Sequence, residues 1–384
     1  MTVFTRYKLP VLIILVLFLG LTSCKKKEPD SQSPVQIPIG IALSLTGNFS
    51  PYGIMQKNGI ELAFIELNNR SGVTGIKFVP GFMDDKSVPD TCRKIFRDLI
   101  FNHKALVIIG PTSSNCAFTA DTAAQNNKVV VMGISNTVPG IVEMGDYIFR
   151  NSLPESAVIP NTVQVTHSKL GYSRIAIVYG DDDPYTIGAY DAFRTSFEST
   201  PGVNIVTTQI VHKGDTLFKD QLNQVKASNP DIIVLAALVN EASRLMVQAR
   251  MLGIPDNVRF IGGNSFNTSK LWKQAGKAAQ GAICGSAWIF SEETPGNDQF
   301  VATYIRLFGR VPDQFAAQAY ASAYIIADAL SRTKELNSEA LRNALVNTRN
   351  VPTILGTFSF DASRNPVHLP VLQELVDGEF VLFE

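Results

Sequence analysis

Two short runs of small and hydroxyl-bearing residues have the composition of an anion-binding site. The runs are Gly110 to Asn115 (GPTSSN) and Gly133 to Thr137 (GISNT), and each follows an apolar segment. Glycine permits a tight turn, serine and threonine can cap a following helix, and the free N–H groups of a helix start attract a carboxylate. Each charge-assisted hydrogen bond there contributes roughly 1.5–3 kcal/mol when water is excluded. Simple helix capping is the alternative interpretation of both runs.

The sequence lacks the motifs of common catalytic and cofactor sites. It has no glycine-rich dinucleotide motif, P-loop, nucleophile elbow or zinc-protease motif. Its 4 histidines are scattered, and the acidic run Asp181 to Asp183 lacks EF-hand spacing, so this run favours a helix start over a metal site. Lys plus Arg and Asp plus Glu each number 34, which argues against a general nucleic-acid binder. We therefore expect no enzyme, no cofactor, no metal site and no nucleic-acid partner.

The first residues are expected to be an export signal. Two basic residues precede an apolar run from Val11 to Leu19, which is too short to span a membrane comfortably. The run ends in Leu-Thr-Ser-Cys, which resembles the lipobox of bacterial lipoproteins and would make Cys24 the lipidated first residue. An ordinary secretory signal with a chance cysteine is the alternative. We expect a signal peptide at 1–23, a flexible polar tether at 24–36, and an exported protein anchored to membrane lipid on the periplasmic or extracellular side.

Strand-like and helix-like patterns alternate twice along the remaining chain. Apolar runs such as Ala105 to Ile109 and Ile232 to Ala236 read as strands, and segments such as Thr91 to Phe101 have helical spacing. This alternation favours right-handed crossovers and parallel sheets. Because the pattern restarts after Pro154, we predict an α/β protein with two doubly wound, Rossmann-like lobes. Ligands of such sheets bind beyond the carboxyl ends of the strands, where both polar runs lie.

Short segments spread over the chain resemble the branched-chain amino-acid (Leu/Ile/Val) binding family of ABC transporter solute receptors, which are type I periplasmic binding proteins. They include IGIALSLTGNFSPYG (Ile39 to Gly53), VIIGPTSS (Val107 to Ser114), RIAIVYGDDDPYTIG (Arg174 to Gly188) and QARMLGI (Gln248 to Ile254). The resemblance implies two lobes joined by three hinge crossings, with lobe 1 at 37–150 plus 285–353 and lobe 2 at 151–284 plus 354–384. It also implies a small solute held between closing lobes and an ABC permease as partner. A sensory lipoprotein without an importer is the alternative.

The resemblance assigns roles to residues of the polar runs and of two loops. Ser114 matches the serine whose hydroxyl and N–H hold the ligand carboxylate. Asn136 matches a position that offers its carbonyl to the ligand's ammonium group, and Thr137 lies beside it as a hydroxyl donor. Tyr52 and Tyr185 match aromatic residues that cover the ligand from lobe 1 and lobe 2.

Two further positions depart from the pattern of amino-acid binders. Leu238 lies where they often carry a tyrosine, and Asn264 lies where they carry the acid that pairs with the ammonium group. Because a neutral amide is a poor partner for a buried ammonium, the ligand could instead be an amide, a keto or aromatic acid, or another small carboxylate. The acidic run 181–183 or Glu241 could also replace the missing acid from another direction.

The cysteines after the expected signal fall in an oxidising compartment if the protein is exported from a Gram-negative cell. The family often has a disulfide between the two loops that precede the helices carrying Cys92 and Cys116, although at neighbouring positions. The resemblance therefore implies a Cys92–Cys116 disulfide, and Cys284 is expected to be a buried free thiol near a hinge.

Overall fold

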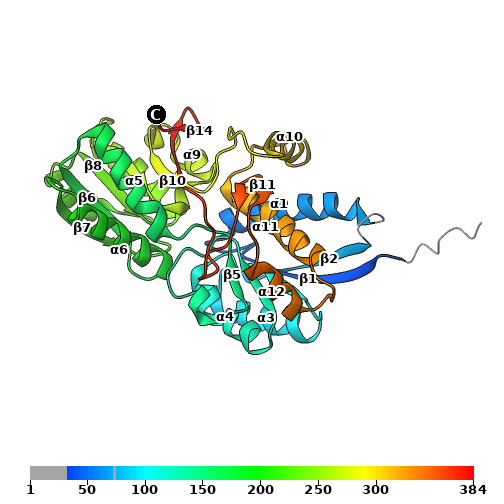
Figure 1. The fold of residues 1–384 in the computed structure, drawn as a ribbon. Coiled ribbons are helices and arrows are strands. Elements are labelled where there is room, and N and C mark those ends of the chain that lie inside the picture. Colours follow the sequence, from blue (N-terminus) through cyan, green and yellow to red (C-terminus); the bar gives the residue numbers. More distant parts are fainter. Residues whose placement is uncertain (1–32, 72–74) are drawn as a thin grey trace, which may run out of the picture. The chain divides into compact units, whose positions relative to one another are not determined.

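The computed structural model describes residues 33–71 and 75–384, which contain two mostly parallel sheets covered by helices (Figure 1). The expected signal peptide and Cys24 lie outside the described residues, so both stay predictions. None of the described helices is both long and apolar enough to cross a membrane. From Pro34 to Glu384 the chain forms one unit by its internal contacts.

A five-stranded parallel sheet forms the first lobe, with the order β2-β1-β3-β4-β5. Its strands are β1 (Val35–Leu43), β2 (Ile76–Asp84), β3 (Val107–Ile109), β4 (Val130–Gly133) and β5 (Ile148–Arg150). The chain runs outward from β1 in one direction and then, from β3, in the other. In doubly wound sheets a ligand binds at this switch point, outside the carboxyl ends of the strands.

Helices cover both faces of this sheet. They are α1 (Ser50–Asn68), α3 (Pro89–Phe101), α4 (Ser114–Asn126), α10 (Asn297–Phe308), α11 (Gln314–Ser331) and α12 (Ser338–Val346), with a 3-10 turn η1 (Val142–Met144). Neighbouring strand residues point to opposite faces. Ile108 and Val131 therefore pack in the cluster with α3 and α4, whereas Ile109 and Met132 pack in the cluster that includes α1 and α11.

A seven-stranded sheet forms the second lobe, with the order β14-β13-β10-β9-β8-β6-β7. Its strands are β6 (Arg174–Gly180), β7 (Asn204–Val211), β8 (Ile232–Ala236), β9 (Arg259–Gly262), β10 (Ile283–Ser286), β13 (Val371–Val376) and β14 (Glu379–Leu382). The strands from β7 to β10 are parallel and repeat the winding of the first sheet, with a switch point between β6 and β8. The last two strands are antiparallel additions at one edge. The two sheets confirm the predicted doubly wound α/β fold.

The second sheet is likewise covered on both faces. Its helices are α5 (Glu155–Leu170), α6 (Pro184–Glu198), α7 (Lys219–Ala227), α8 (Val239–Met251) and α9 (Lys270–Ala275), with 3-10 turns η2 (Asn264–Phe266) and η3 (Gly276–Ala279). Ile177 and Val234 pack with α5 and α6, whereas Val178 and Leu235 pack on the opposite face with α7 and α8.

The chain passes between the two lobes three times, after β5, after β10 and before β13. The last passage comes later than the expected boundary at 354. The strands β11 (Val351–Thr353) and β12 (Gly356–Phe358) form an antiparallel hairpin, and Phe360 packs edge-on against Phe149 of β5. The Arg150 Nε–H donates to Asn365 Oδ1 at 2.7 Å, which holds the segment after the hairpin against the first lobe. The aromatic side chains of residues 356–360 pack in the core of the first lobe, so this segment belongs to that lobe.

Candidate functional site

Loops from both switch points line one cavity between the lobes. The lining residues of the first lobe are Phe49, Tyr52, Thr112, Ser113, Ser114, Ser135 and Phe315, and those of the second are Tyr185, Leu238, Asn264 and Ser265. All but Phe315 follow the carboxyl ends of parallel strands, as expected for sheets of this winding. The cavity volume is about 20 Å³, which suits about one water molecule. The lobes are therefore closed on each other.

Five of the predicted ligand residues meet at this cavity, and two do not. The five are Tyr52, Ser114, Tyr185, Leu238 and Asn264. Asn136 and Thr137 directly follow Ser135 but do not line the cavity.

The role expected for Asn136 needs correction. Its carbonyl oxygen already accepts hydrogen bonds from Arg150 Nη1 at 3.0 Å and from Ser152 Oγ at 2.9 Å. A carbonyl with two protein donors has little capacity left for a ligand ammonium. Thr137 instead lines a neighbouring cavity of about 660 Å³, and its buried hydroxyl oxygen has no hydrogen-bond partner among the described residues.

The start of α4 separates the capping serine from the serine that faces the cavity. Ser113 is the N-cap residue, and its Oγ accepts from the Cys116 N–H at 3.1 Å. Ser114 is the first helical residue, is 2% exposed, and its Oγ has no partner among the described residues. Capping is thus provided by Ser113, and the Ser114 hydroxyl stays available at a helix N-terminus that favours negative charge.

A buried hydrogen-bond network that sequence reasoning missed holds the two polar runs together. Thr112 Oγ1 accepts from the Ser44 N–H at 3.0 Å and donates to Gln56 Oε1 at 2.7 Å. Gln56 Nε2 donates to Ser135 Oγ at 2.7 Å, and this hydroxyl donates to the Thr112 carbonyl at 2.5 Å. Because α1 and the loops after β1, β3 and β4 all contribute, the network fixes the wall on which Ser114 lies. Hydroxyls in both runs hinted at such a network, but nothing in the sequence pointed to Gln56.

The predicted tyrosines bind backbone amides of the second lobe. The Val239 N–H, in the first turn of α8, donates to Tyr52 Oη at 2.9 Å, and the Ser265 N–H donates to Tyr185 Oη at 2.8 Å. Burial raises the pKa of both phenols well above the ordinary value, so both stay neutral. The Tyr52 bond joins the two lobes directly.

Both the backbone N–H and the side chain of Asn264 form hydrogen bonds within the protein. Its Oδ1 accepts a hydrogen bond from Nε2 of Gln314, the first residue of α11 in the other lobe. Gln314 Oε1 accepts in turn from Ser286 Oγ at 2.9 Å and from the Ala287 N–H at 2.8 Å. Asn264 therefore contributes to a contact between the lobes, and its Oδ1 already has one protein donor.

The acids that we considered as replacements lie elsewhere. Asp183 caps α6 by accepting from the Tyr185 N–H at 3.0 Å and pairs with Lys213 Nζ at 3.7 Å. Glu241 accepts from the Gly214 N–H at 2.9 Å. Neither lines the cavity, although both carboxylates lie close enough to Tyr52 to raise the pKa of its phenol.

One buried acid beside the site was missed in the sequence. Glu155 is the first residue of α5, directly after the first crossing, and is 3% exposed. Its Oε1 accepts from the Asn264 N–H at 2.8 Å, and burial raises its pKa to about 7. A glutamate in the first turn of a helix is common because it suits the helix dipole, so its sequence position gave no signal.

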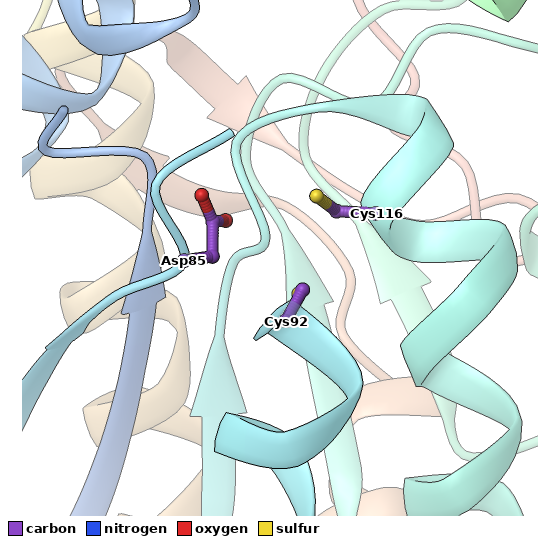
Figure 2. A group of neighbouring side chains, drawn as sticks. All are labelled: Asp85, Cys92 and Cys116. Carbon is purple, nitrogen blue, oxygen red and sulfur yellow. The ribbon is translucent and has the colours of Figure 1, made fainter. Parts of the chain in front are cut away.

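Cys92 and Cys116 are both buried free thiols in this structure, and the disulfide that the resemblance implies between them stays a prediction. Figure 2 shows Asp85, Cys92 and Cys116 gathered from the loop after β2, from α3 and from α4. The two sulfur atoms and a carboxylate oxygen lie within 4.8 Å of one another. Burial raises the pKa of the Cys92 thiol, and a protonated thiol is a poor nucleophile in disulfide exchange. Two cysteine sulfurs and a carboxylate are ligand types that zinc accepts, so the expectation of no metal site stays a prediction.

Cys284 is a buried free thiol, as expected. It lies on β10 immediately before the second crossing, and its Sγ lies 3.1 Å from Asn267 Oδ1. Burial raises its pKa far above the ordinary value. This thiol is therefore inert and belongs to the packing near the crossing.

Comparisons with known proteins agree with this geometry. A family model described as periplasmic binding protein matches residues 36–378. The Leu/Ile/Val-binding protein BraC3 of Rhizobium johnstonii is 24% identical over 331 residues, covering 84% of this chain and 87% of the relative. The structure of the branched-chain amino acid transporter substrate binding protein LivJ from Streptococcus pneumoniae, in complex with isoleucine, superimposes with a TM-score of 0.85 and 26% identity over 90% of this chain and 98% of its own.

A further structure shares the fold at lower identity. It is a solute binding protein of an ABC transporter from R. palustris in complex with benzoate, with a TM-score of 0.81, 19% identity, and coverage of 91% of this chain and 96% of its own. Because the family model spans most of the sequence, the chain belongs to the periplasmic binding protein family, among the type I members that the resemblance to branched-chain amino-acid receptors predicted.

Proposed function

We propose that this protein is an extracytoplasmic solute-binding lipoprotein that captures a small carboxylate-bearing solute between its lobes and presents it to an ABC permease. The buried, unpartnered hydroxyl of Ser114 at the N-terminus of α4 is the observation that carries the proposal. A solute carboxylate placed there accepts from this hydroxyl and from N–H groups of the first turn, in a field that favours negative charge. Relatives named for leucine, isoleucine and valine support an amino acid, and the neutral Asn264 supports the wider class of organic acids and amides.

Capture follows from the contacts that exist only when the lobes meet. In the open form the solute docks on the first lobe through Ser114 and the α4 N–H groups. Closure then brings Tyr185 and Asn264 over it and excludes water, which strengthens each polar contact. A solute that touches both lobes shifts the population toward the closed form, and a permease would recognise that form.

A binding screen tests the solute class. Purified protein is mixed with leucine, isoleucine, valine, their amides and benzoate, and its melting temperature is measured. A solute at about 100 times its Kd stabilises the folded protein by about 2.7 kcal/mol. Ser114→Ala should weaken binding of the best solute by about 1–3 kcal/mol in calorimetry, with an unchanged fold. The exposed Ser199→Ala is the matched control, and normal affinity in the Ser114 variant would count against the site.

Anchoring and transport need separate tests. Fatty-acid labelling should mark the wild-type protein but not Cys24→Ser, and equal labelling of both would exclude lipidation at this cysteine. Cells that lack the protein should take up the identified solute more slowly. Unchanged uptake together with loss of a transcriptional response to the solute would favour the sensory alternative.

A further inference from the structure

Three side chains with metal-binding atoms meet inside the first lobe, and none of them lines the cavity between the lobes. Asp85 follows β2, Cys92 is the fourth residue of α3, and Cys116 lies in the first turn of α4 (Figure 2). All three are 0% exposed, and the two sulfur atoms and a carboxylate oxygen lie within 4.8 Å of one another. Because Phe96, Ile108 and other apolar side chains pack around both cysteines, these polar atoms converge in a dry core.

The loop after β2 holds the Asp85 carboxylate through one of its two oxygens. Oδ1 accepts from Ser44 Oγ at 2.6 Å and from the Ser87 N–H at 2.8 Å. Oδ2 is buried and has no hydrogen-bond partner among the described residues, although buried carboxylate oxygens are normally satisfied. Oδ2 can therefore bind a cation while Oδ1 keeps the contacts that fix the loop.

A second buried carboxylate lies near the two thiols. Asp121 lies further along α4 than Cys116, is 1% exposed, and has no hydrogen-bond partner on either oxygen among the described residues. When ionised, it acts electrostatically on both thiols. No lysine, arginine or histidine in the described part of the chain forms an ion pair with Asp85 or Asp121. Two acids and two thiols thus share one apolar core without a protein cation to offset their charge.

We infer that Asp85, Cys92 and Cys116 form a zinc site inside the first lobe, in which both cysteines bind as thiolates. Zinc accepts sulfur and carboxylate ligands in tetrahedral geometry, at about 2.3 Å from sulfur and about 2.1 Å from oxygen. These lengths put two sulfur atoms about 3.8 Å apart and a sulfur and an oxygen about 3.6 Å apart, which agrees with ligand atoms within 4.8 Å of one another. Each thiol releases its proton to solvent as the metal binds, and the fourth position falls to Asp121 or to water. This site is contrary to the sequence-based expectation of no metal and does not depend on the class of solute.

Metal at this position braces the helix start that faces the solute. Cys116 and Ser114 lie in the same first turn of α4, and the Cys116 N–H donates to the N-cap Ser113. Zinc bonds tie this turn to α3 and to the loop after β2. Because the unfolded chain has no such preformed site, the free energy of metal binding adds to the stability of the first lobe.

Packing of two thiols, or a disulfide between them, would use Cys92 and Cys116 in another way. Cysteine is often buried as a small apolar side chain, but such packing needs no carboxylate beside it. A disulfide brings the two sulfur atoms to about 2.05 Å and leaves neither as a thiolate ligand. Zinc and the disulfide therefore exclude each other, and bound zinc should protect both thiols from oxidation.

The experiment measures metal binding by the reduced protein in a Cys24→Ser background, which leaves only the three buried thiols. Cobalt(II) is titrated first, because cobalt bound to thiolates has a charge-transfer absorption in the near ultraviolet, and zinc is then added to displace it. We expect a single metal ion per chain, and zinc at about 100 times its Kd should raise the melting temperature by about 4 °C. Cys284→Ser removes the buried thiol of the second lobe and is the matched control, so it should behave as the background protein does.

Variants of the three ligands should lose the metal. Cys92→Ser and Cys116→Ser should each abolish the charge-transfer absorption. Asp85→Asn keeps an oxygen that can accept from Ser44 but removes the charge. Because even loss of a group that only supports a ligand weakens metal binding about 10- to 100-fold, the Asp85 variant should bind zinc at least that much more weakly.

Each outcome either supports or overturns the zinc site. Absence of the thiolate-to-cobalt absorption in the reduced background protein would overturn it, and this result needs no ligand variant to fold. An unchanged spectrum in Cys92→Ser or Cys116→Ser would also overturn it, with circular dichroism to identify variants that are unfolded. Diamide takes two electrons and two protons from a dithiol to give a disulfide, and it should fail to join the two cysteines in zinc-loaded protein while it joins them in metal-free protein. Equal oxidation of both forms, or exported protein recovered with these cysteines joined and without zinc, would likewise overturn the inference.

Discussion

The ionisation of Glu155 should be visible in the stability of the unliganded protein. Burial raises its pKa from an ordinary value of 4.5 to about 7. The folded state therefore holds this proton more tightly than the unfolded state. Between about pH 4.5 and pH 7 the folded state binds more protons, so the free energy of unfolding falls as the pH rises. Each pKa unit corresponds to about 1.4 kcal/mol, so the loss attributable to Glu155 is about 3 kcal/mol.

Neighbouring groups do not titrate in this window. The titratable groups that act on Glu155 are Tyr185 on α6 and Cys284 on β10, and burial raises the pKa of both above their ordinary values. Both therefore stay neutral up to pH 8. Burial also raises the pKa of Asp313 to about 7, but that contribution is common to wild type and variant and cancels in their difference.

The assay is thermal unfolding of wild type and Glu155→Gln at pH 4.5, 5.5, 6.5 and 7.5. Unfolding entropy is about 2 cal/mol/K per residue, so about 3 kcal/mol corresponds to about 4 °C for a unit of this size. The melting temperature of wild type should fall relative to the variant by about that amount between the extremes. A constant difference at every pH would refute the reasoning, because it would mean that the pKa of Glu155 is the same in the folded and unfolded protein.

Three other perturbations test further contacts. Tyr52→Phe removes the 2.9 Å hydrogen bond to the Val239 N–H, so the unliganded protein should populate the open form more. Its radius of gyration in small-angle scattering should then be larger. An unchanged radius would mean that this hydrogen bond does not hold the lobes together. Oxidation should join Cys92 to Cys116, and mass spectrometry before and after reduction should differ by two protons; two free thiols in protein purified from its exported location would disprove the bridge. Gly110→Ala should destabilise the protein by about 2 kcal/mol or more in chemical unfolding, because φ is +119° and a Cβ would lie 2.0 Å from a carbonyl oxygen of β1; a neutral effect would contradict this.

The parts of the site that lie directly after strands could be predicted from the sequence. Runs such as Ile232 to Ala236 are continuous and apolar because both faces of a parallel sheet are covered, and this marks where the strands end. Ser114 and Tyr185 each lie in the first turn of a helix soon after such an end, so the winding of the sheets brings them together.

The errors arose where a single residue's direction or a long-range contact decides the role. Asn136 and Ser135 are adjacent, yet only Ser135 lines the cavity, because the Asn136 carbonyl points to Arg150 and Ser152. Glu155 is remote in sequence from both switch points, and only packing of α5 under the Asn264 turn places it there. The segment from Gly356 to Phe360 reads as a short strand, and its assignment to the first lobe depends on aromatic contacts, because Phe358 packs against Phe360 and Phe360 against Phe149 of β5.

The hydrogen bond between Tyr52 and the first turn of α8 has a consequence for signalling fidelity. The Val239 N–H in the first turn of α8 finds its acceptor, the Tyr52 hydroxyl, in the other lobe. Closure of the lobes therefore satisfies this N–H even when no solute is bound. This hydrogen bond thus stabilises the closed form of the unliganded protein. A membrane partner that recognises the closed form would also respond to closed protein that holds no solute. The strength of the Tyr52 hydrogen bond therefore sets the ratio between responses to liganded and to unliganded protein.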